Sequence, residues 1–137
     1  MSQIKREVSL FVPYQINDGK VRLFMQKRDE KQERSPGFFA FFGGGVDEGE
    51  SPEAALVREV REELDLDLVD HTFFGDYDTV AGVKHVYVLK VDDDFKNKIT
   101  VLEGEYGKFL NEKDVASEPK IIEHDKEILH DLFQKLY

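Results

Sequence analysis

The chain has 137 residues, of which 19 are lysine or arginine and 29 are aspartate or glutamate, so its formal net charge at pH 7 is −10. A chain of this length has room for one domain with a substantial core, and we expect residues 1–137 to form it. The acidic balance argues against a broad basic surface that binds a nucleic-acid backbone. Because the chain has no cysteine, disulfides, thiol nucleophiles, cysteine-ligated zinc and iron–sulfur clusters are excluded.

No segment approaches the roughly 20 apolar residues that a membrane helix needs, and the start of the sequence does not resemble a secretory signal. The lack of cysteine also suits a reducing compartment. We therefore expect a soluble, cytoplasmic protein.

Alternating apolar residues predict two strands, at 8–16 and 21–28, joined by a hairpin turn at the Asn-Asp-Gly sequence 17–19. Four phenylalanines follow within residues 38–42. They could line a pocket that stacks on a base, but alternating aromatics are more often part of a core, and we favour the core. Ser51 as an N-cap and Pro52 at the first helical position then predict a helix over residues 52–64.

The second half of the chain shows the same mixture of elements. Strands are predicted at 73–77 and 83–91, around a turn that contains Gly82, with further short strands at 99–102 and 108–110. Apolar residues spaced three and four apart predict an amphipathic packing helix at 125–135. Strands and helices are mixed, so the fold class is α/β or α+β.

Most of the negative charge is concentrated in residues 47–70, which carry ten carboxylates against two arginines. At 100° per residue, the predicted helix has an apolar edge and an acidic edge, the latter formed by Glu59, Glu62 and Glu63. Like charges at this spacing repel each other and destabilise the helix unless a cation binds between them. Carboxylate clusters suit hard divalent ions such as Mg²⁺, which proteins often hold together with substrate phosphates. The glycines at 43–45 would let the backbone turn and approach a ligand, although a plain loop has the same composition.

These residues match a known signature. The run Gly44, Glu50, Arg58, Glu59, Val60, Glu62, Glu63 and Leu66 resembles the Nudix box, G-x5-E-x7-R-E-U-x-E-E-x-G-U, where U is aliphatic. The sequence departs from the pattern at Asp65, where the family has a glycine that would end the helix with a positive φ. A softer departure is Phe42, where many relatives have proline.

The resemblance implies an α/β fold, a Nudix-type α/β/α sandwich with a mixed central β-sheet. It also implies Mg²⁺-dependent hydrolysis of a diphosphate linkage in a nucleoside triphosphate or a nucleoside diphosphate derivative, with Mn²⁺ as a substitute ion. The metal ligands implied are the Gly44 carbonyl, Glu59, Glu62, Glu63 and Glu103. Glu50 and Arg58 are then organisers of these ligands. Which of Glu62, Glu63 and Glu103 accepts the proton of the attacking water stays open.

Two assignments outside the box are less determined. The segment 103–109 is similar to one that supplies a further glutamate in MutT-like members, which assigns Glu103, with Glu105 as the alternative. Arg28 matches a frequent family arginine that contacts phosphate or base, and Gly43 and Gly44 would also contact the substrate. A surface arginine is an equally good reading of Arg28.

Two other functions, a nucleotide sensor and a calcium binder, can each be compared with one feature of the sequence. A catalytically silent Nudix-like nucleotide sensor would usually have lost box glutamates, and all four are present here. A calcium binder needs a spaced D-x-D-x-D-G loop, which the run 92–94 lacks. The four histidines, at 71, 85, 124 and 130, are scattered without metal-ligand spacing. The partner expected is a small-molecule nucleotide, and the family's common homodimers allow a second copy of the chain.

Overall fold

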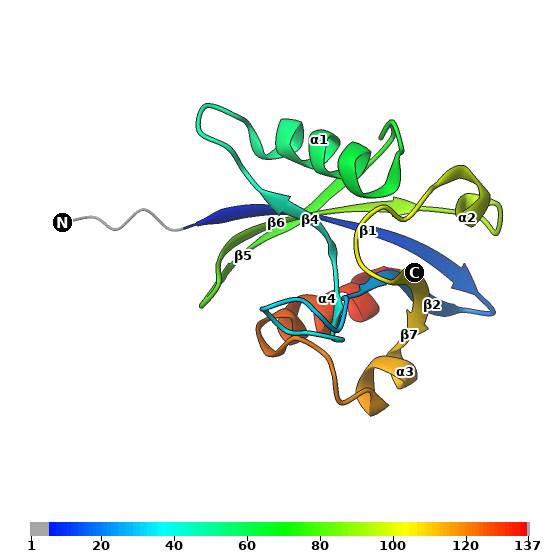
Figure 1. The fold of residues 1–137 in the computed structure, drawn as a ribbon. Coiled ribbons are helices and arrows are strands. Elements are labelled where there is room, and N and C mark those ends of the chain that lie inside the picture. Colours follow the sequence, from blue (N-terminus) through cyan, green and yellow to red (C-terminus); the bar gives the residue numbers. More distant parts are fainter. Residues whose placement is uncertain (1–5, 137) are drawn as a thin grey trace.

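The computed structural model describes residues 6–136, and within that range seven strands form one mixed sheet with helices on both sides (Figure 1). Helix α1 covers one face and α4 covers the other. The α/β/α sandwich implied by the resemblance is therefore confirmed. Residues 1–5, the first part of the segment that does not resemble a secretory signal, lie outside the described residues.

The elements follow in the order β1 (Glu7–Asn17), β2 (Lys20–Lys27), β3 (Phe39–Ala40), β4 (Phe42–Gly45), α1 (Pro52–Leu64), β5 (Thr72–Thr79), β6 (Gly82–Lys90), α2 (Phe95–Lys98), β7 (Tyr106–Asn111), α3 (Glu112–Ser117), the short 3-10 helix η1 (Glu123–Asp125) and α4 (Lys126–Lys135). Both predicted hairpins, the helix at 52–64, the strand around 108–110 and the C-terminal helix are confirmed. The short elements β3, β4, α2 and α3 were not predicted.

Strand β1 lies at the centre of the sheet and has different partners along its length. It runs parallel to β6 over residues 7–14. On its other side, residues 8–11 pair antiparallel with β4 and residues 14–17 pair antiparallel with β2. The glycines of β4 are thereby fixed beside the start of β1. The buried Ser9 of β1 donates a hydrogen bond from Oγ to the Pro52 carbonyl (2.6 Å), which ties the first turn of α1 to the same place.

Two apolar cores lie on opposite faces of the sheet. The core on the α4 side contains Val8, Leu10 and Val12 of β1 with Ile128, Leu129 and Leu132 of α4. The core on the α1 side contains Phe11 and Phe24 with Leu56, Val60 and Leu64 of α1. Phe39 and Phe41 belong to the first core and Phe42 to the second, so the core interpretation is confirmed for these three. Phe38 is half-buried and belongs to neither core.

Helix α1 is capped as the sequence predicts. The Ser51 Oγ accepts a hydrogen bond from the Ala54 N–H (3.1 Å), and Pro52 occupies the first turn. At the other end Asp65 adopts the left-handed conformation, with φ 51° and ψ 43°, and donates its N–H to the Arg61 carbonyl. The box position at which the family has glycine is therefore a positive-φ position in this chain as well.

The strand predicted at 99–102 is wrong. Its apolar residues do pack, because Ile99 and Val101 contact the α1-side core. The backbone, however, bonds to the end of a helix and not to a strand: Thr100 N–H donates to the Leu64 carbonyl (2.9 Å) and Leu102 N–H to the Glu63 carbonyl (2.7 Å). The last carbonyls of a helix have no partner inside it, and this segment satisfies two of them.

Candidate active site

The acidic edge of α1 brings one carboxylate into the interior. Glu63 is 2% exposed, and its Oε1 accepts a hydrogen bond from the Gly43 N–H at 3.1 Å. Burial raises the pKa of Glu63 to about 9; the Glu103 and Glu59 carboxylates add to the rise and the Gly43 N–H opposes it. Burial therefore disfavours the charged form of Glu63, and a cation bound beside it would favour that form.

The glycines of β4 lie against these carboxylates. A Cβ at Gly44 would be 2.4 Å from the carboxyl carbon of Glu59, so glycine is what allows that side chain to lie on the strand. Gly43 has φ +135°, and a Cβ there would be 2.0 Å from the Ser9 carbonyl oxygen. The Gly43 N–H is engaged by Glu63, so in this structure it supports a carboxylate and is not free for a phosphate.

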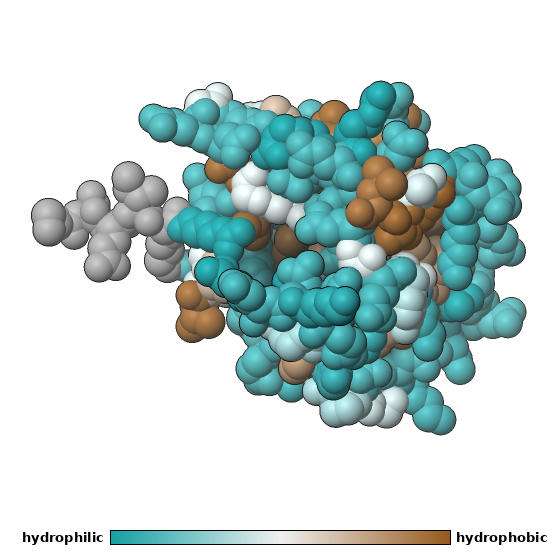
Figure 2. All heavy atoms as spheres, in the orientation of Figure 1, coloured by the Kyte–Doolittle hydropathy of each residue, from teal (hydrophilic) through white to brown (hydrophobic). Residues whose placement is uncertain are grey.

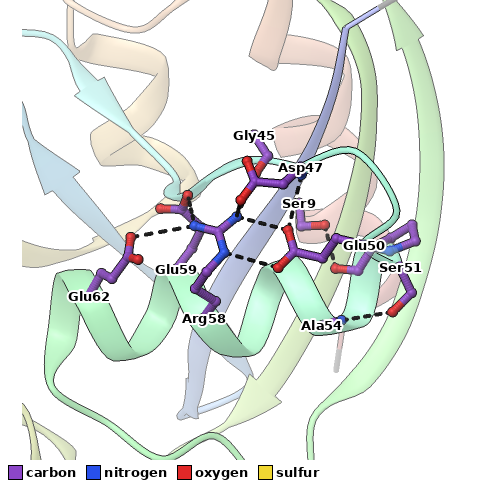
Figure 3. Close-up of polar contacts among 10 residues, drawn as sticks. Ser9, Gly45, Asp47, Glu50, Ser51, Ala54, Arg58, Glu59 and Glu62 are labelled. Carbon is purple, nitrogen blue, oxygen red and sulfur yellow. Dashed lines mark hydrogen bonds and ion pairs between the residues drawn. The ribbon is translucent and has the colours of Figure 1, made fainter.

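Arg58 is the hub of the polar edge (Figure 3). Its Nε and Nη2 bind the Glu50 carboxylate in a bidentate arrangement, at 3.0 and 2.9 Å. Its Nη1 donates to Glu59 Oε1 (2.9 Å), and its Nη2 also donates to the Gly45 carbonyl (2.9 Å). Arg58 therefore links the loop before α1, strand β4 and the carboxylate of Glu59.

The same pairing sets the protonation of its partner. The hydrogen bond from Arg58, helped by one from the Asp47 N–H, lowers the pKa of Glu50 to about 2. The hydrogen bonds that Arg58 donates to Glu50 and Glu59 in turn raise the pKa of Arg58 above its ordinary value. Glu50 and Arg58 are thus held as a charged pair, which suits fixing neighbouring ligands and not moving protons.

Glu62 and Glu103 lie at the exposed side of the cluster. The Glu62 side chain is 58% exposed, with an oxygen 3.5 Å from Arg58 Nη1. Glu103 belongs to the loop before β7, and its carboxylate acts on the pKa of Glu63. Glu105, the alternative further glutamate, lies where its N–H donates to the Lys27 carbonyl (2.8 Å), at the start of the β7–β2 pairing. The charge effect on Glu63 favours Glu103 over Glu105 as the fourth acidic group of the cluster.

Arg28 faces its own loop. Its Nε donates to the Arg34 carbonyl (3.1 Å) and its Nη2 lies 3.5 Å from Gln32 Oε1. These contacts brace the segment between β2 and β3. The face of the molecule that carries β4 is largely hydrophilic, and Figure 2 shows a hollow there between α1 and this segment.

The histidines and the aspartate run have other contacts. His85 bridges two carboxylates, with Nδ1 2.6 Å from Asp76 and Nε2 2.8 Å from Glu7. The run 92–94 forms a turn before α2, in which Asp92 Oδ1 accepts from the Asp94 N–H (3.0 Å). Neither arrangement resembles a calcium loop.

The donor set at the α1 edge fits a hard divalent cation by its chemistry. It consists of carboxylate oxygens, and the buried Glu63 faces two further carboxylates whose mutual repulsion a cation would relieve. The side chains are not preassembled as a cage: among residues 6–136, no three acidic or histidine side chains converge closely enough to hold an ion. Glu59 is engaged by Arg58, so metal binding would require its carboxylate to be shared or to turn.

Two buried polar residues near this cluster were missed by the sequence reasoning, Ser9 and Gln26. Both are at most 4% exposed and sit in strands among apolar neighbours. The signal that could have found them is a polar residue at a core-facing position of an alternating strand, since burying such a group is unfavourable unless it is hydrogen-bonded.

Comparison with known protein families identifies a domain that includes the box and most of the chain. The model of the NUDIX domain matches residues 5–132. The chain belongs to the NUDIX domain family. Among the described helices of this NUDIX chain, none is long and apolar enough to cross a membrane.

The relatives of this NUDIX chain are distant or partial. It is 40% identical over 65 residues to the dihydroneopterin triphosphate diphosphatase of Escherichia coli strain K12. That match covers 47% of this chain and 40% of the relative, so it spans about two fifths of the relative's length.

Solved structures agree in fold. The MutT structures from Aliivibrio salmonicida and Vibrio cholerae include a chain with a TM-score of 0.75 and 22% identity, the match covering 97% of this chain and all of that one. The NUDIX domain of Shewanella oneidensis NrtR, solved in complex with ADP ribose, has a TM-score of 0.75 and 15% identity, covering 99% of this chain and 91% of that one.

Proposed function

We propose that this chain hydrolyses a diphosphate linkage in a nucleoside triphosphate or a nucleoside diphosphate derivative, with Mg²⁺ as cofactor and Mn²⁺ as a substitute. The observation that carries the proposal is the buried Glu63, which is 2% exposed and faces the carboxylates of Glu59 and Glu103. A buried carboxylate beside other carboxylates destabilises a fold. Such an arrangement is expected where a cation binds together with a phosphate substrate.

Glu59, Glu63 and Glu103 are the proposed metal ligands, with Glu62 and the Gly44 carbonyl as further ligands by resemblance to the family. A divalent cation bound there would neutralise phosphate charge and acidify a water molecule. The hollow between α1 and the segment after β2 would leave this edge open to a substrate (Figure 2).

The chain's own residues have two tasks in this reaction. Arg58 holds Glu50 and Glu59 in place, so that the Glu59 carboxylate stays against Gly44. A glutamate must also take a proton: the water oxygen bonds to phosphorus, the bridging P–O bond breaks, and the proton of the water passes to a carboxylate oxygen of Glu62, Glu63 or Glu103. Arg28, Gly43 and Gly44 are the proposed substrate contacts outside the carboxylate cluster, and contact of a phosphate with the Gly43 N–H would require Glu63 to release that group.

The test is hydrolysis of a substrate panel with and without Mg²⁺. The panel contains nucleoside triphosphates, nucleotide sugars, ADP-ribose, dinucleoside polyphosphates and triphosphorylated RNA ends. Dihydroneopterin triphosphate joins it because a partial relative is named for that substrate. We expect Mg²⁺-dependent cleavage of at least one compound and a large loss of turnover in Glu62→Gln and Glu63→Gln.

A matched control comes from the same helix. The Glu53 side chain is 66% exposed and lies 3.6 Å from His71 Nε2, outside the carboxylate cluster, so Glu53→Gln should keep wild-type turnover. Near-wild-type turnover in both Glu62→Gln and Glu63→Gln would contradict the assigned site. Nucleotide binding without hydrolysis of any compound would instead favour the catalytically silent sensor domain.

We also propose a cytoplasmic enzyme that acts on small nucleotides and not on long nucleic acids. Light scattering after size-exclusion chromatography distinguishes a monomer from the homodimer that is common in the family.

A further inference from the structure

The loop that carries Glu103 is hydrogen-bonded to the buried side-chain amide of Gln26. Gln26 is 4% exposed, and its Nε2 donates a hydrogen bond to the Glu103 carbonyl at 2.9 Å. Gln26 alternates in β2 with Met25 of the α4-side core, and so lies on the same face of the sheet as Phe24 and α1. A buried amide without a partner is costly, so this bond fixes both the side chain and the backbone that it meets.

The residues on either side of Glu103 are fixed as well. Leu102 N–H donates to the Glu63 carbonyl (2.7 Å), and Glu105 N–H donates to the Lys27 carbonyl (2.8 Å). The loop is therefore attached at one end to the helix that carries the other carboxylates and at the other end to β2. Between these two attachments, the hydrogen bond from Gln26 acts at Glu103 itself.

Gly104 allows this close packing. Its φ is +83°, and a Cβ there would lie 2.7 Å from Gln26 Cγ and 2.8 Å from the Lys27 carbonyl oxygen. Any larger residue would have to lift the loop from β2. The distance between Glu103 and the helix thus depends on contact between Gly104 and the stem of Gln26.

We propose that Gln26 is a positioning residue: it holds the backbone of Glu103 so that the Glu103 carboxylate faces Glu63 and the two can share one divalent cation. This inference rests on the proposed function, in that Glu103 is taken to be a metal ligand. It predicts that Gln26 affects metal affinity only through Glu103.

The test measures Mn²⁺ binding by electron paramagnetic resonance on the full chain without nucleotide, so that it does not depend on turnover. Gln26→Leu removes the donor at similar volume and should weaken Mn²⁺ binding about tenfold, the lower end of what loss of a ligand-supporting residue costs. The control is Gln15→Leu. Gln15 is also 4% exposed, and its Nε2 donates to the Asp92 carbonyl at 3.1 Å, in a different loop. Gln15→Leu should change the Mn²⁺ affinity by less than about twofold, the level expected where no ligand-supporting residue is lost.

A double-mutant cycle separates positioning from general damage. Glu103→Ala should weaken Mn²⁺ binding by itself, and adding Gln26→Leu should weaken it no further. Independent, multiplying losses would overturn the inference, as would a folded Gln26→Leu with wild-type affinity. If circular dichroism shows that Gln26→Leu does not fold, Gly104→Ala replaces it in the double-mutant cycle, because the added Cβ would displace the loop from β2.

The outcomes also separate this inference from the proposed function. Wild-type protein that binds Mn²⁺ but hydrolyses nothing would contradict the proposed function, while the cycle would still decide the role of Gln26. Hydrolysis together with an additive cycle would contradict the inference alone. Wild-type protein that binds no Mn²⁺ would overturn the inference.

Discussion

Two buried carboxylates on opposite faces of the sheet have opposite surroundings. Asp125, at the end of η1, is 3% exposed and forms an ion pair with Lys84 of β6, which is 5% exposed. Glu63, on α1, is 2% exposed and faces the carboxylates of Glu59 and Glu103. Asp125 is paired with a cationic side chain of the same chain, whereas the charged neighbours of Glu63 are other carboxylates.

The difference separates a structural charge from a functional one. A buried ion pair joins two elements, and removing one partner strands the other. A buried carboxylate beside other carboxylates weakens the fold, and such perturbed groups cluster at functional sites. The two faces can therefore be tested against each other, because substitutions at Glu63 and Asp125 should affect different properties.

The largest expected effect is on turnover. Glu63→Gln should lower kcat by roughly 10³-fold, the scale on which loss of a proton-transfer or metal-ligand carboxylate acts, without lowering the melting temperature. The measurement is steady-state kinetics with Mg²⁺ beside a thermal melt. A variant with normal kcat, or one that loses kcat only because it unfolds, would remove the distinction between the two carboxylates.

The next effect is on stability. Asp125→Asn should lower the free energy of unfolding by about 3 kcal/mol, because it leaves the buried Lys84 ammonium without a carboxylate, beside a neutral amide and His124 Nδ1. The kcat of the folded fraction should be unchanged. Urea unfolding measures the loss, and the double variant Lys84→Met/Asp125→Leu should recover most of it. A loss of kcat in folded Asp125→Asn would argue that the ion pair also serves the site.

A third effect is a pH dependence that is specific to Glu63. Its pKa rises from 4.5 to about 9 on folding, so the folded state prefers the protonated form. The stability that this preference contributes is complete below about pH 4.5 and is lost as the pH rises towards 9. Glu63→Gln cannot lose a proton. Its melting temperature in the absence of divalent ions should match the wild type near pH 4.5 and rise increasingly above it as the pH approaches 9.

The smallest effect concerns the end of α1. Asp65→Gly should raise the free energy of unfolding by about 0.5–1 kcal/mol, since glycine adopts the left-handed conformation (φ 51°) without the penalty of a side chain. The melting temperature should rise by roughly 2–4 °C, with kcat unchanged. A fall in both would show that the Asp65 carboxyl has a further role.

Periodicity and box spacing were sufficient for the long elements and for the acidic edge of α1. Each depends on residues close together in the chain, as in the Ser51 cap and the Pro52–Leu64 helix. The segment 99–102 was mistaken for a strand because its alternation reflects packing against the core, while its N–H groups bond to α1. Two-residue and four-residue strands such as β3 and β4 carry too little pattern to detect.

The site was predictable only where one helix carries it. The pairing of Arg58 with Glu50 and Glu59 follows from residues within one loop and helix. The burial of Glu63 under Gly43 and the support of Glu103 by Gln26 depend on contacts between segments 20 and 77 residues apart. Local sequence does not specify such contacts, so the relative depth of the four carboxylates required the structure.

The central claim is that Glu63 is a buried carboxylate whose charged form a divalent cation would stabilise. Its most direct test is the titration of Glu63 by carbon-13 NMR. The Glu63 carboxyl signal would be assigned by comparison with Glu63→Gln and followed from pH 4 to 10, with and without Mg²⁺. We expect a pKa of about 9 without the ion and a value well below 7 with it. An ordinary pKa without Mg²⁺, or a raised pKa that Mg²⁺ leaves unchanged, would contradict the claim.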